Sequence, residues 1–232
     1  MPDDRRHRSP LGNDPHAGVR VHHAGPELRD ARAAGLVFHG RGGSAEGMLD
    51  LAHALDVEGV AWLAPEAAGG SWYPYSFLAP IASNEPWLGS ALSLLHRLVA
   101  RCGDAGLVPG RVALVGFSQG ACLSAEYAAR HARGYGGLVL LSGGLIGPPG
   151  TPRAYEGSLD GTPALVACSD VDPHIPVERV HETARVLAEL GANVDERIYP
   201  GLGHTVIDDE IAAAADIVEG IAARSRRPGE GR

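Results

Sequence analysis

The chain has 232 residues, of which 44% are hydrophobic, enough to bury the core of a single domain. Its formal net charge is −8 and it has no basic stripe, so a nucleic-acid partner is not expected. All 20 cationic side chains are arginine, which excludes both a phosphate-binding Walker lysine and a Schiff-base lysine. We therefore expect a small-molecule substrate.

The two ends of the chain differ from its centre in composition. Residues 1–17 and 223–232 are rich in charge, proline and glycine, and we expect them to be flexible tails. The sequence shows neither the apolar core of a signal peptide nor about 18 uninterrupted apolar residues, so we expect a cytoplasmic protein without stable membrane insertion. Cys102, Cys122 and Cys168 contain no CxxC pair and are expected to be reduced structural thiols. The sequence leaves open whether the chain forms a homodimer.

Between these ends, short apolar runs alternate with longer segments of helical periodicity, which is typical of parallel strands buried between helices. The predicted strands are 19–23, 35–39, 60–64, 112–115, 138–141, 164–167 and 194–199. The predicted helices are 44–55, 86–102, 119–132, 177–190 and 206–222. We therefore predict one α/β domain over residues 18–222, with a mostly parallel central sheet and helices on both faces.

A glycine-rich loop, Phe38-His-Gly-Arg-Gly-Gly-Ser44, follows the second predicted strand. Backbone N–H groups of such a loop can bind the oxyanion of an acyl-transfer reaction, and we assign one donor to Arg41. The same loop also fits G-x-G-x-x-A from Gly40 to Ala45, a dinucleotide-binding pattern. That alternative requires an acidic residue about twenty positions later at a strand end, where Glu66 fits only loosely.

Residues 65–86 have no clear period, and we expect them to form a cap-like insertion over a pocket. Together with Trp87 they hold five of the twelve aromatic residues, which argues against disorder. Trp72, Tyr73 and Trp87 are candidate walls of a substrate pocket, with plain core packing as the alternative. Glu85 is a candidate substrate contact, although the proline after it also fits the start of a helix.

The strongest motif is Gly116-Phe-Ser118-Gln-Gly120, which joins an apolar strand directly to an alanine-rich helix. A sharp turn of this kind presents a serine hydroxyl at the carboxyl edge of the sheet, and the helix N-terminus favours negative charge there. The sequence therefore predicts Ser118 as a nucleophile. The backbone N–H of Gln119 is the second expected oxyanion donor.

A serine nucleophile needs a base and an orienting acid, which in this kind of fold follow in the order Ser, Asp or Glu, His. Asp172 lies just past the predicted strand 164–167 and is the expected acid. Asp170 is the alternative, because it lies closer to the strand end. His204 is the expected base, since it alone among the eleven histidines follows the last predicted strand.

No cofactor and no metal ion are predicted. His181-Glu182 begins like a zinc-protease motif, but Arg185 occupies the position of the second histidine. The three cysteines offer no tetrahedral zinc set either.

Together, the motifs FHGRGG, GFSQG, SDVDPHIP and YPGLGH resemble those of the phospholipase/carboxylesterase family, small α/β-hydrolases that include bacterial carboxylesterases and acyl-protein thioesterases. The resemblance covers roughly residues 33–222. It implies the α/β-hydrolase fold, an acyl-enzyme at Ser118, and Asp172 rather than Asp170 as the acid behind His204. Family members often have Leu-Gly-Asp where this chain has Arg-Gly-Gly, so the resemblance does not extend to a long-chain acyl substrate.

Three functional hypotheses result. The first is hydrolysis of a carboxylic ester or thioester of a small or medium-sized substrate. The second keeps the fold but uses it for lactone or C–C bond hydrolysis or for acyl transfer in a biosynthetic pathway. The third is a non-catalytic binding protein, against which the complete set of motifs argues.

Overall fold

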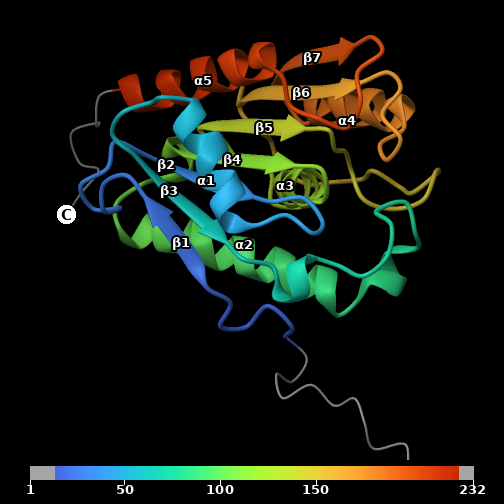
Figure 1. Ribbon diagram of the computed structural model, residues 1–232, viewed down its shortest axis with the longest axis horizontal. Coiled ribbons are helices and arrows are strands. Elements are labelled where there is room, and N and C mark those ends of the chain that lie inside the picture. Colours follow the sequence, from blue (N-terminus) through green and yellow to red (C-terminus); the bar gives the residue numbers. More distant parts are fainter. Residues whose placement is uncertain (1–13, 225–232) are drawn as a thin grey trace, which may run out of the picture.

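The computed structural model describes residues 14–224, which form a seven-stranded sheet between two layers of helices (Figure 1). The strands are β1 Val21–Ala24, β2 Ala33–Phe38, β3 Val60–Pro65, β4 Val112–Phe117, β5 Gly137–Leu141, β6 Pro163–Ser169 and β7 Asn193–Tyr199. Their order across the sheet is β1-β3-β2-β4-β5-β6-β7, and every neighbouring pair is parallel except β1 with β3. The predicted α/β fold with a mostly parallel sheet is confirmed.

Within the described residues, five α-helices and three short 3₁₀ helices accompany the sheet. The α-helices are α1 Ala45–Ala54, α2 Trp87–Asp104, α3 Gln119–Arg130, α4 Val177–Glu189 and α5 Asp208–Ala223. The 3₁₀ helices are Ala68–Gly70, Ile81–Asn84 and Pro109–Arg111. Helices α1 and α5 pack on one face of the sheet, α3 and α4 pack on the other, and α2 packs against α3. The five predicted helices are all present, with ends that differ from the prediction by a few residues.

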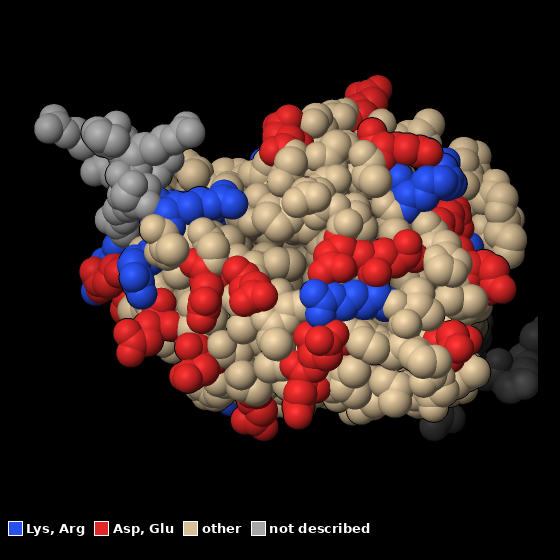
Figure 2. All heavy atoms as spheres, turned by 90° about the horizontal axis from the view of Figure 1, so that it is seen from above, with Lys and Arg blue, Asp and Glu red and all other residues tan. Residues whose placement is uncertain are grey.

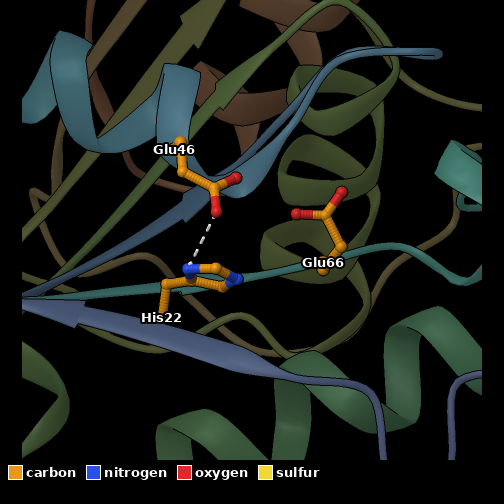
Figure 3. Close-up of side chains that lie close together, drawn as sticks. All are labelled: His22, Glu46 and Glu66. Carbon is orange, nitrogen blue, oxygen red and sulfur yellow. Dashed lines mark ion pairs between the residues drawn. The ribbon is translucent and has the colours of Figure 1, made fainter.

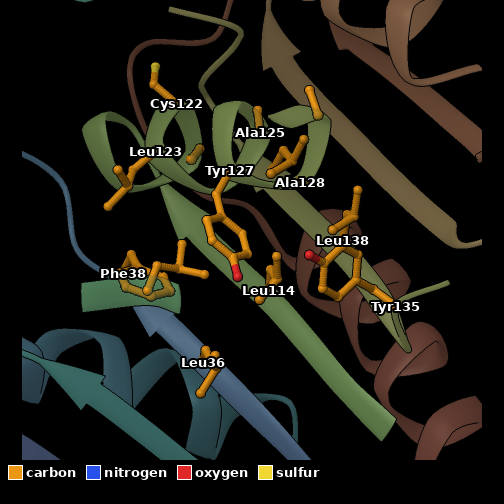
Figure 4. Packing of buried hydrophobic residues seen from close by; sticks show 14 of the residues in the cluster. Leu36, Phe38, Leu114, Cys122, Leu123, Ala125, Tyr127, Ala128, Tyr135 and Leu138 are labelled. Carbon is orange, nitrogen blue, oxygen red and sulfur yellow. The ribbon is translucent and has the colours of Figure 1, made fainter. Parts of the chain in front are cut away.

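The core lies on both sides of the sheet, because helices cover both faces. Leu114 of β4 belongs to the cluster under α3, whereas its neighbours Ala113 and Val115 belong to the cluster under α1 and α5. Tyr127 of α3 is fully buried above Leu36 and Leu114 (Figure 4). Strands buried on both faces can be apolar throughout, which is why their sequences show no polar alternation.

The loops that carry the predicted site residues leave the sheet at one edge. Strands β4 to β7 point in the same direction (Figure 1), and the register pairs Phe117 with Leu141 and Ser169 with Tyr199. The carboxyl ends of β4, β6 and β7 therefore lie in the same rim, which is where ligands bind in open α/β sheets.

Charged side chains of both signs are mixed on the face shown in Figure 2. Arg197 of β7 illustrates local pairing, with Asp195 at 2.8 Å and Asp209 at 2.7 Å. The face in Figure 2 has no continuous basic patch, the feature that attracts nucleic-acid phosphates. Within residues 14–224, no helix combines the length and the apolar composition needed to cross a membrane.

The predicted N-terminal tail includes four residues that belong to the folded domain. Residues 1–13 and the last part of the predicted C-terminal tail, 225–232, lie outside the described residues. His16, by contrast, is fully buried: its backbone N–H donates to Ser90 Oγ at 2.8 Å, and its Nε2 lies 3.0 Å from the carbonyl oxygen of Trp72. The expectation of a flexible tail through residue 17 is therefore wrong for residues 14–17, because one histidine supplies contacts that polar composition does not reveal.

The burial of His16 makes stability depend on pH. Burial lowers the pKa of His16 below its usual value of 6.5, so between these two values the unfolded chain binds a proton that the native chain does not bind. The free energy of unfolding should therefore fall as the pH falls through this window. We therefore measure the free energy of unfolding with urea at about pH 7.5 and at about pH 5.5. It should decrease less between these two pH values in His16→Gln than in the parent protein. His53→Gln, at an exposed position, should keep the parent's pH dependence; an equal loss in both variants contradicts the role given to His16.

Candidate active site

Ser118 lies between the last residue of β4 and the first residue of α3. Its backbone has φ 54° and ψ −118°, a conformation that residues other than glycine rarely adopt. Close packing surrounds it: a Cβ on Gly116 would lie 2.4 Å from the carbonyl carbon of Gly120, and a Cβ on Gly120 would lie 2.0 Å from the carbonyl oxygen of Phe38. Both glycines are therefore required, and the packing of β2, β4 and α3 holds the serine in its strained conformation.

Asp172 and His204 come from separate loops and are hydrogen-bonded to each other. Nδ1 of His204 lies 2.6 Å from Oδ2 of Asp172, and Oδ1 accepts the backbone N–H groups of His174 at 2.8 Å and Ile175 at 3.1 Å. Burial by itself raises the pKa of Asp172, but the hydrogen bonds from His204 and the two N–H groups outweigh it and leave the pKa below its usual value. Asp172 is therefore an ionised acceptor at neutral pH and fixes the orientation of the imidazole.

Asp170, the alternative acid, has a different partner. Its exposed side chain accepts the backbone N–H of Gly201 at 2.8 Å. Beside it, Ser169 Oγ donates to the carbonyl oxygen of Leu202 at 2.5 Å. These two bonds tie the loop after β6 to the loop that carries His204. Of the two aspartates, Asp172 contacts the histidine and Asp170 anchors its loop.

Ser118 and His204 line one cavity of about 540 Å³ at the carboxyl edge of the sheet. The imidazole of His204 packs against the ring of Phe117, with centroids 4.8 Å apart, and against the ring of His174, 4.9 Å away. Among the described residues, no hydrogen bond joins the Ser118 hydroxyl to His204. In enzymes without substrate this contact is often long and tightens on binding. In the structure, Asp172 and His204 are thus already hydrogen-bonded, and Ser118 and His204 line the same cavity.

Arg41 and Gln119 line the same cavity. Gly40 lies so near the serine that a Cβ on it would be 3.1 Å from Ser118 Cβ. Neither the Arg41 nor the Gln119 backbone N–H donates a hydrogen bond to another described residue. Two unused main-chain donors therefore lie in the segments that adjoin Ser118.

The side chains of Arg41 and Gln119 hold residues 65–87, the aromatic segment, in place. Sequence reasoning missed this role because it considered only their main-chain N–H groups. The Arg41 guanidinium donates to Ser71 Oγ at 3.0 Å and to the carbonyl oxygens of residues 73–75 at 2.7 to 3.0 Å. The Gln119 amide accepts the N–H of Trp72 at 2.9 Å and donates to the Tyr73 carbonyl at 2.8 Å. No local pattern predicts these contacts, since they join residues at least 30 positions apart.

Two of the predicted pocket walls lie away from the cavity: Trp72 in the core, and Trp87 partly buried against it. Trp72 is fully buried and donates its indole N–H to the carbonyl oxygen of His39 at 2.8 Å. Trp87 packs edge-on against His16, with ring centroids 5.5 Å apart. Neither belongs to the described residues around the cavity, so the prediction of substrate contacts is wrong for both. Aromatic density showed that the segment is ordered but not which face each ring presents.

Glu85 is also not a cavity residue. Its Oε2 accepts the backbone N–H of Gly89 at 2.9 Å in the first turn of α2, as the helix-start alternative required. Tyr73 does line the cavity, together with Tyr75 and Phe77, which the sequence did not single out. The expectation of a substrate contact is therefore wrong for Glu85 and agrees with the cavity lining for Tyr73.

Glu66 anchors the glycine-rich loop rather than a ribose. Its Oε2 accepts the Ala45 N–H at the start of α1 at 2.9 Å, and its Oε1 lies 3.8 Å from Nε2 of His39. Ser44 Oγ accepts the N–H of Gly47 at 3.1 Å. Two of the N–H groups with which the N-terminus of α1 would bind a pyrophosphate are thus taken by the chain's own side chains. This arrangement argues against the dinucleotide-binding alternative.

The described side chains whose spacing comes nearest to a cation site are His22, Glu46 and Glu66 (Figure 3). One ligand atom from each lies within 4.8 Å of the others, and Nδ1 of His22 is 3.3 Å from Oε1 of Glu46. They come from β1, α1 and the residue after β3, and none of them lines the cavity around Ser118. We assign this group no part in the chemistry of the site.

A buried ion-pair network supports one wall of the cavity. The Arg179 guanidinium lies 5.8 Å from the ring centroid of Phe77 and pairs with Glu182 at 2.8 Å. Arg153 pairs with the same Glu182 at 2.8 Å and lies 4.0 Å from Glu126. Sequence reasoning missed the network because its members come from α3, α4 and the connection between β5 and β6, which only the fold brings together.

A sequence model of the phospholipase/carboxylesterase family matches residues 27–221, which include all the motifs described above. The chain belongs to the phospholipase/carboxylesterase family. It is similar to acyl-protein thioesterase 1 of Gibberella zeae, with 32% identity over 136 residues that cover 55% of this chain and 56% of that protein. It is also similar to acyl-protein thioesterase 1 of Saccharomyces cerevisiae, with 25% identity over 225 residues that cover 87% and 97%.

Among solved structures, a phospholipase/carboxylesterase from Dyadobacter fermentans superimposes with a TM-score of 0.83 at 39% identity, covering 86% of this chain and 96% of that one. The match thus extends over nearly the whole bacterial protein, whereas it spans just over half of the Gibberella protein. The family and the α/β-hydrolase fold follow from these similarities.

The packing at Gly116 leads to a stability prediction. We expect Gly116→Ala to lower the free energy of unfolding by about 2–4 kcal/mol, because its Cβ would overlap the backbone of Gly120. Gly103→Ala in α2 is the matched control, since its Cβ meets nothing within 4 Å; it should be neutral or raise stability by about 0.5–1 kcal/mol. Urea unfolding measures both. Equal stability of the two variants contradicts the tight turn.

Proposed function

We propose that this chain is a serine hydrolase that cleaves a carboxylic ester or thioester through an acyl-enzyme at Ser118. The observation that carries the proposal is the hydrogen-bonded pair of Asp172 and His204, whose imidazole shares a cavity with the strained Ser118. The names of the related proteins, carboxylesterases and acyl-protein thioesterases, support the same reaction class.

In the first half of the reaction, His204 is the base. Because the ionised Asp172 can only accept, the proton of the imidazole lies on Nδ1, and Nε2 is left with the lone pair. Nε2 takes the proton of the Ser118 hydroxyl as Oγ bonds to the substrate carbonyl carbon and the carbonyl electrons move onto oxygen. Asp172 then stabilises the imidazolium. The contact between serine and histidine, open in the free protein, forms in this step.

The oxyanion is bound by the backbone N–H groups of Arg41 and Gln119, which are free of other described acceptors. Collapse of the tetrahedral intermediate breaks the bond to the alcohol or thiol, which leaves with the proton from His204. A water molecule, deprotonated by His204, attacks the acyl-enzyme in the same manner and releases the carboxylic acid. The helix dipole of α3 adds to the stabilisation, because Ser118 precedes its first residue.

The cavity volume of about 540 Å³ suits a small or medium-sized substrate. It opens between the glycine-rich loop, the aromatic segment and the loop of Asp172. A cytoplasmic location remains a prediction from the sequence.

Removal of the nucleophile tests the proposal directly. Ser118→Ala should lower p-nitrophenyl acetate hydrolysis by at least about 10³-fold and abolish fluorophosphonate labelling, because no other group can form the acyl-enzyme. Circular dichroism should show an unchanged fold. Ser83→Ala, at an exposed serine outside the cavity, should keep both activities. Labelling that persists in the Ser118 variant rules out the proposed nucleophile.

The two aspartates provide a matched pair for the acid. Asp172→Asn should reduce kcat by about 10⁴-fold, because an amide favours the wrong imidazole tautomer and does not stabilise the imidazolium. Asp170→Asn should change kcat less than about tenfold, since an amide oxygen can still accept the Gly201 N–H. Steady-state kinetics on p-nitrophenyl acetate decides between them. The opposite ranking would assign the acid to Asp170.

A further inference from the structure

The cavity has an exposed rim and a buried interior. The rim residues are Arg41, Pro74, Tyr75, Ser76 and His174. The interior residues are Tyr73, Phe77, Cys122 and Ile175. Three of these four interior residues are apolar or nearly so, as expected for a binding pocket, and the fourth, Tyr73, brings a hydroxyl to a place without bulk water.

The Tyr73 hydroxyl lacks a strong partner. The residue is only 1% exposed, and its Oη has no nitrogen or oxygen partner among the described residues. The polar group that it faces is the Cys122 thiol, a weak acceptor. Burial raises the pKa of Tyr73 well above its usual value of 10, so the hydroxyl is a neutral donor at physiological pH.

Cys122 is only a weak partner for this donor. Its Sγ already receives the backbone N–H of Gly144 at 3.4 Å, and burial raises the pKa of its thiol to about 12, so the sulfur carries no charge. The thiol points away from the sheet residues beneath α3 (Figure 4). Its backbone N–H bonds to the Ser118 carbonyl one helical turn earlier, so the weak pair of Tyr73 and Cys122 lies about one turn from the nucleophile.

The position of Tyr73 is fixed from its backbone. Its carbonyl oxygen accepts from Arg41 at 2.9 Å, from Gln119 at 2.8 Å and from Ser71 at 2.8 Å. A side chain anchored in this way cannot easily swing its hydroxyl out to water. A buried donor that stays unpaired is unfavourable, and a ligand acceptor that meets it removes that penalty.

The charges behind the interior indicate which kind of acceptor fits. Arg153 and Arg179 are balanced by Glu126 and Glu182, and each arginine is within 4.0 Å of at least one of these carboxylates. Neither of these two arginines is therefore an unpaired cation that would favour a carboxylate beside Phe77. The Arg41 guanidinium lines the cavity at its exposed rim and is held by neutral oxygens of residues 71–75. An uncharged oxygen needs no counter-ion and matches a single O–H donor.

We propose that Tyr73 is a specificity-determining residue and that the substrate carries a neutral oxygen acceptor, such as an ether, hydroxyl or carbonyl oxygen, in the group that enters the buried interior. This inference rests on the proposed function, because the acceptor is presented only when the ester is bound at Ser118. A plain alkyl chain in the same place would leave the Tyr73 hydroxyl unpaired.

The test compares isosteric ester pairs that differ by CH₂ against O. On the acyl side the pairs are p-nitrophenyl butanoate with methoxyacetate, pentanoate with 3-methoxypropanoate, and hexanoate with 4-methoxybutanoate; on the alcohol side the pair is butyl acetate with 2-methoxyethyl acetate. The measured quantity is the ratio of kcat/KM, oxygen over methylene. Comparison of this ratio between parent and Tyr73→Phe cancels the intrinsic reactivity of each ester. We expect the ratio to fall about tenfold in Tyr73→Phe for at least one pair.

Tyr135→Phe is the matched control, because the buried Tyr135 hydroxyl donates to the His131 carbonyl at 2.9 Å and lies outside the cavity. It should keep every ratio and lower Tm, whereas Tyr73→Phe should leave Tm unchanged or raise it. Ratios that change less than twofold in all pairs, or a Tm loss in Tyr73→Phe equal to that of the control, overturn the proposal. Ser118-dependent hydrolysis of the methylene esters in the same assays keeps that outcome separate from a failure of the proposed function.

Discussion

The hydrogen bond between His204 and Asp172 is the interaction on which the rest of the site depends. At 2.6 Å it joins the loop after β7 to the loop after β6, and it fixes both the tautomer and the orientation of the imidazole. The bond is possible because β6 and β7 are parallel neighbours whose carboxyl ends lie side by side. Around it, two N–H groups hold the aspartate, while Asp170 and Ser169 hold the histidine loop. Backbone hydrogen bonds thus hold both partners of the contact between His204 and Asp172.

Ser118 is held by a different physical principle. Its conformation follows from steric exclusion, since the backbones of β2, β4 and α3 approach so closely that only glycine fits beside the turn. Hydrogen bonds orient His204, the proposed base, whereas close packing orients Ser118, the proposed nucleophile. The two halves meet through the rings of Phe117 and His204, while the hydrogen bond between Ser118 and His204 is not formed in the free protein.

Arg41 and Gln119 link the reaction to the shape of the pocket. Their main-chain N–H groups adjoin the nucleophile, and their side chains bind the main chain of residues 71–75. The same bonds fix Tyr73 in the cavity interior, where its hydroxyl has no nitrogen or oxygen partner among the described residues. An arginine is suited to this task, because its fork of donors can bind several carbonyl oxygens at once. In the proposed mechanism, substrate recognition and oxyanion binding consequently share two residues.

The sequence by itself determined the elements of the fold and identified Ser118, Asp172 and His204 as candidates. Hydrophobic periodicity and the strand–turn–helix motif are local patterns, which can be recognised along the chain without the tertiary structure. It could not distinguish pocket walls from core among Trp72, Tyr73 and Trp87, since alternate burial in an irregular segment has no period. Only the tertiary structure decided that Asp172 rather than Asp170 meets the histidine, that His16 is part of the core, and that Arg41 clamps the aromatic segment. Each of these is a contact between residues more than thirty positions apart, and its partner is chosen by how helices and loops pack around the sheet rather than by neighbours along the chain.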